Sequence, residues 1–311
     1  MVAVISVVGA NGVQGLAQIR QALAAGYDVR GISRHRSEIL DEQFPDIDFR
    51  SADLLDEASL APAFEGSDYI LVNHPVPLRP RRVEMLSAIG RAAVQLGIKR
   101  VVYNTATWIP DRPGDPFSYG DNTAICNALF RTGAPATVFG SVLFMDNLQT
   151  NWAKRYIADE SRFHYPHGPS MLANWISLDD VGKVMVHSLT RPDFEGAWMN
   201  IGGPERLSPM QVCGILSEVT GREIKYDPAS PEQFGRMLAD GLGEAVPAER
   251  KQIFADYIRD FYIYNNSAPT KPFEVDFGYV QSRLPDVTFE TMREWASRQD
   301  WSAGSKGSGG D

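Results

Sequence analysis

Runs of apolar residues alternate with amphipathic segments along the first two thirds of the chain. The first run, residues 2–8, is almost entirely apolar, which predicts a strand buried on both faces. Leu16, Ile19 and Leu23 then recur on one face of a helix. Further strands are predicted at 28–33, 47–50, 68–72, 100–103, 136–139 and 197–201. Because such alternation implies parallel pairing with right-handed crossovers, we predict an α/β fold: a Rossmann-like doubly wound parallel sheet with a smaller, mostly helical C-terminal lobe.

Helix signals dominate the second half of the chain. Ser177 and Ser208 each begin a capping box, with Gly221 ending the second helix. From residue 231 onward the pattern is helical, and residues 152–169 are aromatic without a clear period, so we expect irregular structure there. An aromatic stripe at helical spacing consists of Phe254, Tyr257, Ile258, Phe261 and Tyr262. Such a stripe usually belongs to the core, but it can also line a pocket or a partner surface.

A glycine-rich turn joins the first strand to the first helix. Its sequence is Gly9-Ala10-Asn11-Gly12-Val13-Gln14-Gly15. Glycine suits a tight turn at the first position, close backbone approach to a pyrophosphate at the second, and tight helix packing at the third. The N–H groups and the positive end of the helix dipole then hold phosphates. We therefore predict a dinucleotide site, the alternative being a turn that serves packing alone.

The residues after the second strand indicate which dinucleotide binds. That strand ends in Ser33-Arg34-His35-Arg36, and no carboxylate follows before Glu38. A carboxylate here would bind the ribose 2′-hydroxyl of NAD, whereas cations accommodate a 2′-phosphate. We predict NADP(H) as the cofactor, with Arg34 as the first choice for that phosphate and Arg36 as an auxiliary; the alternative is a solvated basic turn. Asp53, in the pair Asp53-Leu54, either accepts from the adenine amino group or caps the next helix.

Loops that leave the carboxyl ends of the other predicted strands add candidates. Asn73-His74 begins the loop 73–77, which we expect to flank the cofactor, and His74 is either a proton donor or structural. Thr105, in the segment Asn104–Trp108, leads into a Pro/Gly-rich loop at 109–117 that has the composition of a lid.

Composition narrows the classes of function. The net charge is −9, which disfavours direct binding of nucleic acid. The two cysteines, Cys126 and Cys213, lack metal-ligand spacing, which favours buried, reduced thiols. His164 and His167 have no third ligand at useful spacing, so no metal site is expected. The first apolar run is too short for a signal sequence or a membrane span, so we expect a cytoplasmic protein that does not bind membranes.

The ordered motifs resemble one family. They are GANGVQG, VRGISR, Asp53-Leu54, IKRVVYNTAT, FMDN, ANWISLDDVGKV, NIGGPERLSPMQV and SPEQF. From residue 2 to about 234 this series resembles the NmrA-like branch of atypical short-chain dehydrogenases. The resemblance implies an NADP(H)-binding domain over 1–152, onto which 174–190 packs, and a substrate lobe over 153–301. We expect 302–311 to be a disordered Gly/Ser-rich tail.

The same resemblance implies two kinds of function. The family contains reductases of quinones, dyes and phenylpropanoid-type aromatics, and also redox sensors that bind the dinucleotide without turnover. Typical short-chain dehydrogenases use Tyr-x-x-x-Lys, in which the lysine lowers the pKa of the tyrosine that protonates the product. Here Asn122 stands at the lysine position and Ser118 at the tyrosine position, with Tyr119 one residue away.

We therefore predict an NADPH-dependent oxidoreductase that reduces a conjugated or aromatic small molecule. Such an acceptor stabilises its own product anion, and Tyr119, Thr105, Thr107 or His74 could supply a hydrogen bond or a late proton, while Asn122 could bind the nicotinamide ribose. The alternatives are a non-catalytic NADP(H) sensor that acts through a protein partner, and an isomerase or lyase that uses the same pocket. A homodimer is also possible. The expected substrate-contacting residues are Trp108, Phe144, Asn147 and Trp152.

Overall fold

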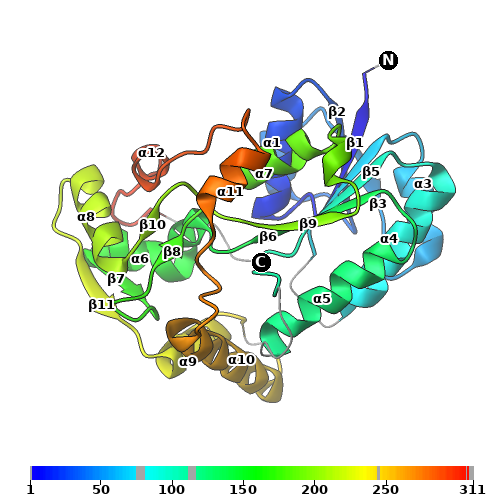
Figure 1. Cartoon of the computed structure of the whole chain (residues 1–311). Coiled ribbons are helices and arrows are strands. Elements are labelled where there is room, and N and C mark those ends of the chain that lie inside the picture. Colours follow the sequence, from blue (N-terminus) through cyan, green and yellow to red (C-terminus); the bar gives the residue numbers. More distant parts are fainter. Residues whose placement is uncertain (1, 75–80, 111–116, 244–245, 306, 308–311) are drawn as a thin grey trace.

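The central sheet has the predicted parallel architecture. The computed structural model describes residues 2–74, 81–110, 117–243, 246–305 and 307. Within these residues, seven parallel strands follow the order β3-β2-β1-β4-β5-β6-β9 (Figure 1). The strands are β1 (Val4–Val8), β2 (Asp28–Ser33), β3 (Asp48–Ser51), β4 (Tyr69–Val72), β5 (Arg100–Asn104), β6 (Ala136–Ser141) and β9 (Ala197–Ile201). The predicted fold class is confirmed, and β2 and β9 begin and end at the predicted residues.

Helices cover both faces of this sheet (Figure 1). One face carries α1 (Val13–Ala24), α2 (Glu38–Gln43) and α7 (Leu178–Ser188), and the other carries α3 (Glu57–Phe64), α4 (Arg82–Leu96) and α5 (Phe117–Phe130). Helix α7 lies so close to α1 that a Cβ on Gly182 would meet Gln21 Cγ at 2.9 Å and the Ala17 carbonyl oxygen at 3.2 Å. Helix α7 therefore packs directly on α1.

The segment expected to form the second lobe also contributes to the sheet. Strand β9 pairs with β6, and helix α11 (Phe277–Arg283) packs beside it, with Val280 in the same core as α1 and α7. The chain therefore leaves the central sheet after β6 and returns twice. The border of the two lobes in space does not coincide with a single position in the sequence.

The second lobe is mostly helical, and one prediction for it is wrong. Segment 152–169 is not irregular: it contains α6 (Asn151–Glu160) and strand β7 (Arg162–Tyr165), which pairs in parallel with β11 (Lys225–Pro228). The missed signals are Ala153 and Ile157, spaced by one helical turn, and the buried, alternating Phe163 and Tyr165. The remaining elements are η2 (Met145–Gln149), β8 (Ala173–Asn174), η3 (Pro192–Phe194), β10 (Arg206–Leu207), α8 (Pro209–Thr220), α9 (Pro231–Asp240), α10 (Ala248–Ser267) and α12 (Met292–Ser297).

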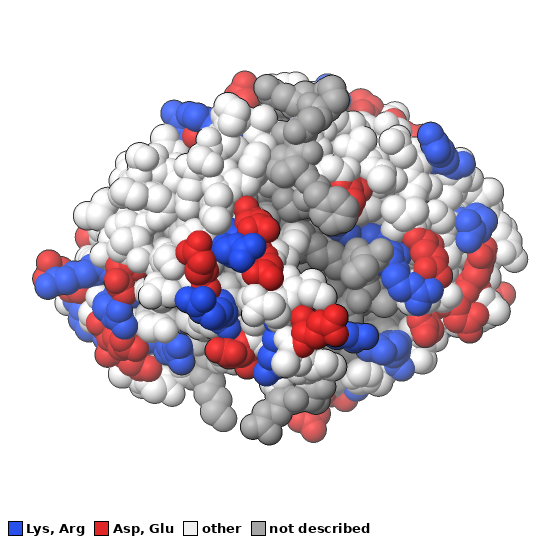
Figure 2. All heavy atoms as spheres, turned by 90° about the horizontal axis from the view of Figure 1, so that it is seen from below, with Lys and Arg blue, Asp and Glu red and all other residues white. Residues whose placement is uncertain are grey.

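The aromatic stripe lies on α10 and packs largely inward. Tyr262 is buried, and Phe261 contacts the rings of Tyr119, Tyr262 and Phe273. Figure 2 shows the face that carries α9 and α10, where basic and acidic side chains are interspersed and form no patch of one sign. Ion pairs such as Arg259 with Asp256 neutralise charge locally on α10.

The described residues of the C-terminal tail contact α6 and the turn before it. The backbone N–H of Gly304 donates to Asp159 of α6 at 2.7 Å. A Cβ on Gly307 would lie 2.6 Å from the backbone nitrogen of Asn151. Gly304 therefore contacts the end of α6, and Gly307 lies against its beginning. The two cysteines, Cys126 and Cys213, are free and buried, as predicted.

Glycines in the segment NIGGPE allow the chain to cross over strand β8. A Cβ on Gly203 would lie 1.9 Å from the carbonyl oxygen of Trp175, and one on Gly202 would lie 2.7 Å from Asn174 Cβ. The Asn174 side chain then donates to the Gly203 carbonyl and accepts from the backbone N–H of Val275. This crossing connects the central sheet to the second lobe.

The crossing makes a specific prediction about stability. We expect Gly203→Ala to lower the free energy of unfolding by about 3 kcal/mol, because backbone rather than a movable side chain occupies the space. Gly214→Ala is the matched control: Gly214 lies inside α8 with nothing within 4 Å of an added Cβ. That change should raise stability by about 0.5–1 kcal/mol. Urea denaturation measures both, and equal effects would contradict the packing argument.

Candidate functional site

The glycine turn lies at the carboxyl edge of the sheet, beside the point where the strand order reverses. Strand β1 is flanked by β2 and β4, and ligands of open α/β sheets bind in the crevice at such a point. Gly9 has φ +76°, and a Cβ on Gly15 would lie 2.2 Å from the Gly9 carbonyl oxygen, so both positions need glycine for the fold itself.

Gly12 is different, because none of the residues that the structure describes requires it to be glycine. Its φ of −84° suits any residue, and an added Cβ would meet only the Gly9 carbonyl oxygen at 3.6 Å. Gly12 is also the N-cap of α1, which begins at Val13, and no side chain in the described part of the chain caps this end of the helix. The first N–H groups of α1 are therefore open to an anionic ligand that approaches the backbone closely.

Asn11 and Ser33 contact each other and shape the neighbouring loop. The Asn11 amide nitrogen donates to Ser33 Oγ at 3.2 Å and to the His35 carbonyl at 2.6 Å, and its oxygen accepts from the Ser37 backbone N–H at 3.1 Å. Ser37 in turn caps α2. These contacts position the loop that carries Arg34 next to the glycine turn.

The two arginines of this loop have different environments. Arg36 donates to the carbonyl oxygens of Phe44, Pro45 and Ile47 and pairs with Asp41, so its guanidinium holds the loop together. Arg34 is exposed, and its side chain has no hydrogen bond or ion pair with any residue that the structure describes. Arg34 alone of this pair is thus available to a ligand phosphate.

Asp53 and Leu54 follow β3 at the same edge. Asp53 is exposed and its Oδ1 accepts from the backbone N–H of Leu55 at 3.0 Å. The cap of α3 is Asp56, not Asp53, which removes one of the two roles considered for Asp53. Leu54 is buried in the core and contributes packing.

Asn73 and His74 follow β4. The buried Asn73 amide exchanges two hydrogen bonds with Gln18 of α1, at 2.7 and 2.8 Å, and so fastens α1 to the end of β4. His74 is half-buried, with Nδ1 3.1 Å from the hydroxyl of Tyr103. The rest of this loop, 75–77, lies outside the described residues, as does 111–116 of the expected lid.

The loop after β5 is fixed at several points. The Thr105 hydroxyl donates to the Thr107 carbonyl at 2.5 Å. The Asn122 amide donates to Thr107 Oγ1 at 2.9 Å and to the Trp108 carbonyl at 2.7 Å, and accepts from the buried guanidinium of Arg82 at 3.0 Å. Asn122 is completely buried, so it supports the loop beside the site.

Tyr119 also makes structural contacts. It is completely buried, and its hydroxyl donates to Asn265 Oδ1 on α10 at 2.8 Å. Its ring packs against Trp108 with centroids 5.4 Å apart. This hydroxyl joins α5 to α10 and is directed at the second lobe, which argues against a role as the proton donor.

The four residues expected to contact a substrate lie in different parts of the structure. Trp108 is buried against Tyr119, whereas Trp152 packs on Tyr165 and Phe234 inside the second lobe. Phe144 bridges to Ile176 beside the sheet. Asn147 donates to the Tyr165 hydroxyl at 3.4 Å.

Sequence reasoning missed two amides at the same edge, Asn104 at the end of β5 and Asn200 in β9. Asn200 accepts from the Ile109 backbone N–H at 2.7 Å and donates to the Ile109 carbonyl at 2.9 Å. Its side chain crosses Gly140, where an added Cβ would lie 2.2 Å from it. The available signal was an asparagine at or near the end of three buried apolar strands, at 73, 104 and 200.

A buried carboxyl connects this edge to α7. Asp146 Oδ2 accepts from the Leu178 backbone N–H at 2.9 Å, at the beginning of α7. Burial raises the pKa of Asp146 to about 6, with a smaller contribution from the neighbouring charge of Asp179. The motifs FMDN and WISLDD, distant in sequence, are joined by this contact.

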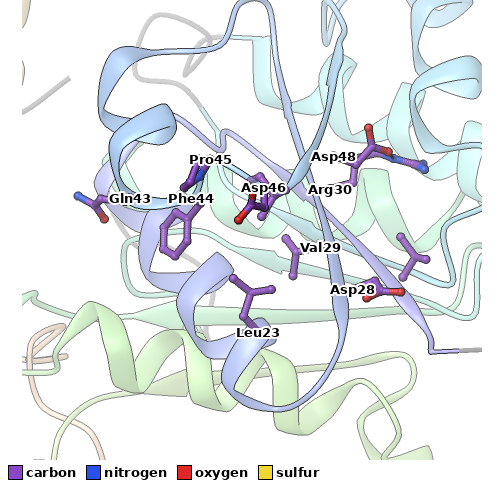
Figure 3. A pocket seen from close by; sticks show the side chains of 11 residues that line it. Leu23, Asp28, Val29, Arg30, Gln43, Phe44, Pro45, Asp46 and Asp48 are labelled. Carbon is purple, nitrogen blue, oxygen red and sulfur yellow. Dashed lines mark hydrogen bonds and ion pairs between the residues drawn. The ribbon is translucent and has the colours of Figure 1, made fainter.

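A groove of about 590 Å³ lies at the opposite edge of the sheet (Figure 3). It includes Val4, Asp28 and Asp48, which are the first residues of β1, β2 and β3. It is therefore separate from the glycine turn, which follows the last residue of β1.

Comparison with known proteins identifies the family of this chain. The model of the NmrA-like family matches residues 1–296. The chain belongs to the NmrA-like family. A curated relative, NAD(P)H azoreductase of Xenophilus azovorans, is 27% identical over 254 residues, which are 81% of this chain and 86% of the relative.

Solved structures of NmrA-like and related proteins share the fold. Triphenylmethane reductase of Citrobacter sp., complexed with NADP(H), has a TM-score of 0.72 at 20% identity, covering 95% of this chain and 99% of that chain. Nmra, a negative transcriptional regulator in complex with NAD, has a TM-score of 0.74 at 19% identity, covering 96% and 99%. None of the helices in the described part of this chain has the length and hydrophobicity needed to cross a bilayer.

The raised pKa of Asp146 predicts a pH dependence. Between the ordinary pKa of 3.8 and about 6, the folded state binds more protons than the unfolded state, so stability falls as the pH rises through this window. Asp146→Asn keeps an acceptor for Leu178 and removes this loss. Relative to the wild type, the variant should gain on the order of 1–2 kcal/mol between pH 4 and 7. Urea denaturation at several pH values tests this, and parallel curves for the two proteins would contradict it.

Proposed function

We propose that this protein is an NADPH-dependent oxidoreductase that reduces conjugated or aromatic small molecules by hydride transfer. The observation that carries the proposal is the uncapped beginning of α1 at the carboxyl edge, with open space at Gly12 and the unpaired Arg34 beside it. The diphosphate of a dinucleotide matches the open beginning of α1 at Gly12, and a 2′-phosphate matches Arg34. The azoreductase, which matches over most of both chains, supports a reductase of aromatic substrates.

The side chains near the site favour an acceptor that needs no strong general acid. When bound, the reduced nicotinamide supplies a hydride. Asn122 is neutral and fully hydrogen-bonded, and the Tyr119 hydroxyl is committed to Asn265, so neither replaces the usual tyrosine–lysine pair. A conjugated acceptor delocalises the product anion, which can then take its proton from solvent. The residues of the site accordingly have to orient the reactants and exclude water.

The packing of α10 favours this proposal over a sensor that acts through a protein partner. A sensor that used the aromatic stripe would present Tyr257 and Phe261 outward. Instead Phe261 packs on Tyr119 and Phe273, and Tyr257 stacks on Phe261 with ring centroids 6.2 Å apart. These rings are engaged within the monomer.

Turnover of NADPH tests the proposal directly. The purified protein is mixed with NADPH and a panel of azo dyes, triarylmethane dyes, quinones and enones, and the absorbance of the reduced nicotinamide is followed. We expect oxidation with at least one conjugated acceptor, and transfer of deuterium from NADPH deuterated at C4 to the product. Tight binding of both redox forms without turnover on any acceptor would show a sensor instead.

Tyr119→Phe serves as the control for a proton donor in this assay. Because its hydroxyl contacts α10, we expect the variant to lose about 1–2 kcal/mol of stability while kcat stays within roughly threefold of wild type. A loss of turnover at unchanged stability would make Tyr119 catalytic after all.

The cofactor preference has a separate test. We expect Arg34→Ala to lower the ratio of NADPH to NADH affinity by about 10- to 100-fold, the value of a charge-assisted hydrogen bond to phosphate. Arg36→Ala is the matched control, which should reduce stability and leave the ratio unchanged, because Arg36 holds the loop. Isothermal titration with both dinucleotides measures the ratio. An unchanged ratio in Arg34→Ala would assign the preference to other residues.

A further inference from the structure

A chain of oriented amides connects the beginning of α1 to the end of β5. Asn104, the last residue of β5, is completely buried and contacts three separate parts of the chain. Its Nδ2 donates to Gln14 Oε1 at 2.9 Å, and its Oδ1 accepts from the Ala106 backbone N–H at 3.1 Å and from Ser141 Oγ at 2.5 Å. Gln14 lies in the first turn of α1.

The direction of each hydrogen bond is fixed by one backbone group. The Ala106 N–H can only donate, so the Asn104 atom that faces it must be the oxygen. The Asn104 amide nitrogen is then directed at Gln14, which must present its own oxygen in return. As a result the Gln14 amide nitrogen, with two N–H donors, is directed away from Asn104.

Ala106 adds evidence that this arrangement is specific. Its φ is +57°, a left-handed conformation that is unfavourable for a residue with a Cβ. The hydrogen bond from its N–H to Asn104, two residues earlier, closes an Asx turn that holds this conformation. Backbone strain at the carboxyl end of a central strand is typical of a functional site.

The Gln14 amide nitrogen has no partner among the residues that the structure describes, and the side chain is half-buried. It lies between the open beginning of α1 and the end of β5. A dinucleotide with its 2′-phosphate at Arg34 and its diphosphate at α1 extends its other half toward β4 and β5, on the far side of β1. This half carries oxygen acceptors on the ribose, the carboxamide and the adjoining phosphate.

We propose that Asn104 positions the Gln14 carboxamide so that it donates a hydrogen bond to an oxygen of the nicotinamide-side half of the dinucleotide. The inference rests on the proposed dinucleotide binding and adds a residue that distinguishes the two halves of the cofactor. Asn104 does not contact the ligand in this proposal; it is a positioning residue that acts through Gln14.

Two ligands separate this role from a general effect on the site. NADPH carries both halves, whereas adenosine 2′,5′-bisphosphate carries the adenosine and 2′-phosphate but lacks the nicotinamide side. Gln14→Glu keeps the acceptor for Asn104 and replaces the donor by a carboxylate oxygen. We expect NADPH affinity to fall by at least about tenfold and affinity for the bisphosphate to stay within about twofold, both measured by isothermal titration.

A double-variant cycle tests the part assigned to Asn104. Asn104→Asp replaces the donor that faces Gln14 by a carboxylate oxygen. We expect the Gln14 amide to flip, so that its nitrogen faces the new carboxylate and its oxygen faces the ligand. This variant should show the same selective loss of NADPH affinity as Gln14→Glu. In a Gln14→Leu background, Asn104→Asp should have no further effect, because nothing remains for it to orient. Retained binding of the bisphosphate shows that each variant is folded, and the Gln14 variants stand on their own if Asn104→Asp does not fold.

The outcomes are distinguishable. If the wild-type chain does not bind NADPH, the proposed function is wrong and this inference falls with it. If the wild type binds NADPH but Gln14→Glu weakens both ligands equally, or neither, the role of Gln14 is wrong while the proposed function stands. Additive losses in the double variant would assign Asn104 an effect independent of Gln14.

Discussion

Helix α1 can begin where it does only because Gly15 brings its first turn against the carbonyl of Gly9, a contact that leaves no space for a side chain. That contact sets the distance between α1 and β1. Helix α7 packs on α1 at Gly182. The backbone N–H of Leu178, the first residue of α7, donates to Asp146 and so fixes the segment after β6. A single close approach at the beginning of the chain thus determines where segments more than a hundred residues later can lie.

The carboxyl edge built on this contact is polar but largely uncharged. Asn73, Asn104, Asn122 and Asn200 each use both ends of the amide, and each fixes a loop or a helix at the end of a strand. Amides provide oriented dipoles without the large cost of desolvating a charge. The loops that leave the sheet are therefore positioned before any ligand arrives, which suits a reaction in which two flat reactants must be held in register.

Local patterns predicted the sheet well because most of its strands contain short, buried apolar runs between recognisable turns, with β3 as the exception. Such signals exist within a few residues of sequence, as at β2 and β9. They ranked Arg34 above Arg36 but could not show that Arg36 is engaged elsewhere, because only the folded loop brings the carbonyl oxygens of residues 44–47 to Arg36. Tyr119 and Asn265 are 146 residues apart in the sequence, so a local sequence pattern could not predict the hydrogen bond between them either. Strand β7 was missed because its only local signal, the alternation of Phe163 and Tyr165, is short and lies within a segment rich in aromatic residues.

The uncapped start of α1 would also link stability to the concentration of the proposed cofactor. Seven helices, α2, α3, α7, α8, α9, α11 and α12, begin with a side-chain cap, whereas α1, like α4, α6 and α10, has no such cap among the described residues. A ligand that binds the folded state alone stabilises it by RT ln(1 + [L]/Kd), about 2.7 kcal/mol at a hundredfold excess over Kd. For the proposed dinucleotide at α1, mass action would supply a free energy that the capped helices obtain from their own sequence, and the folded fraction of the protein would then follow the concentration of that ligand.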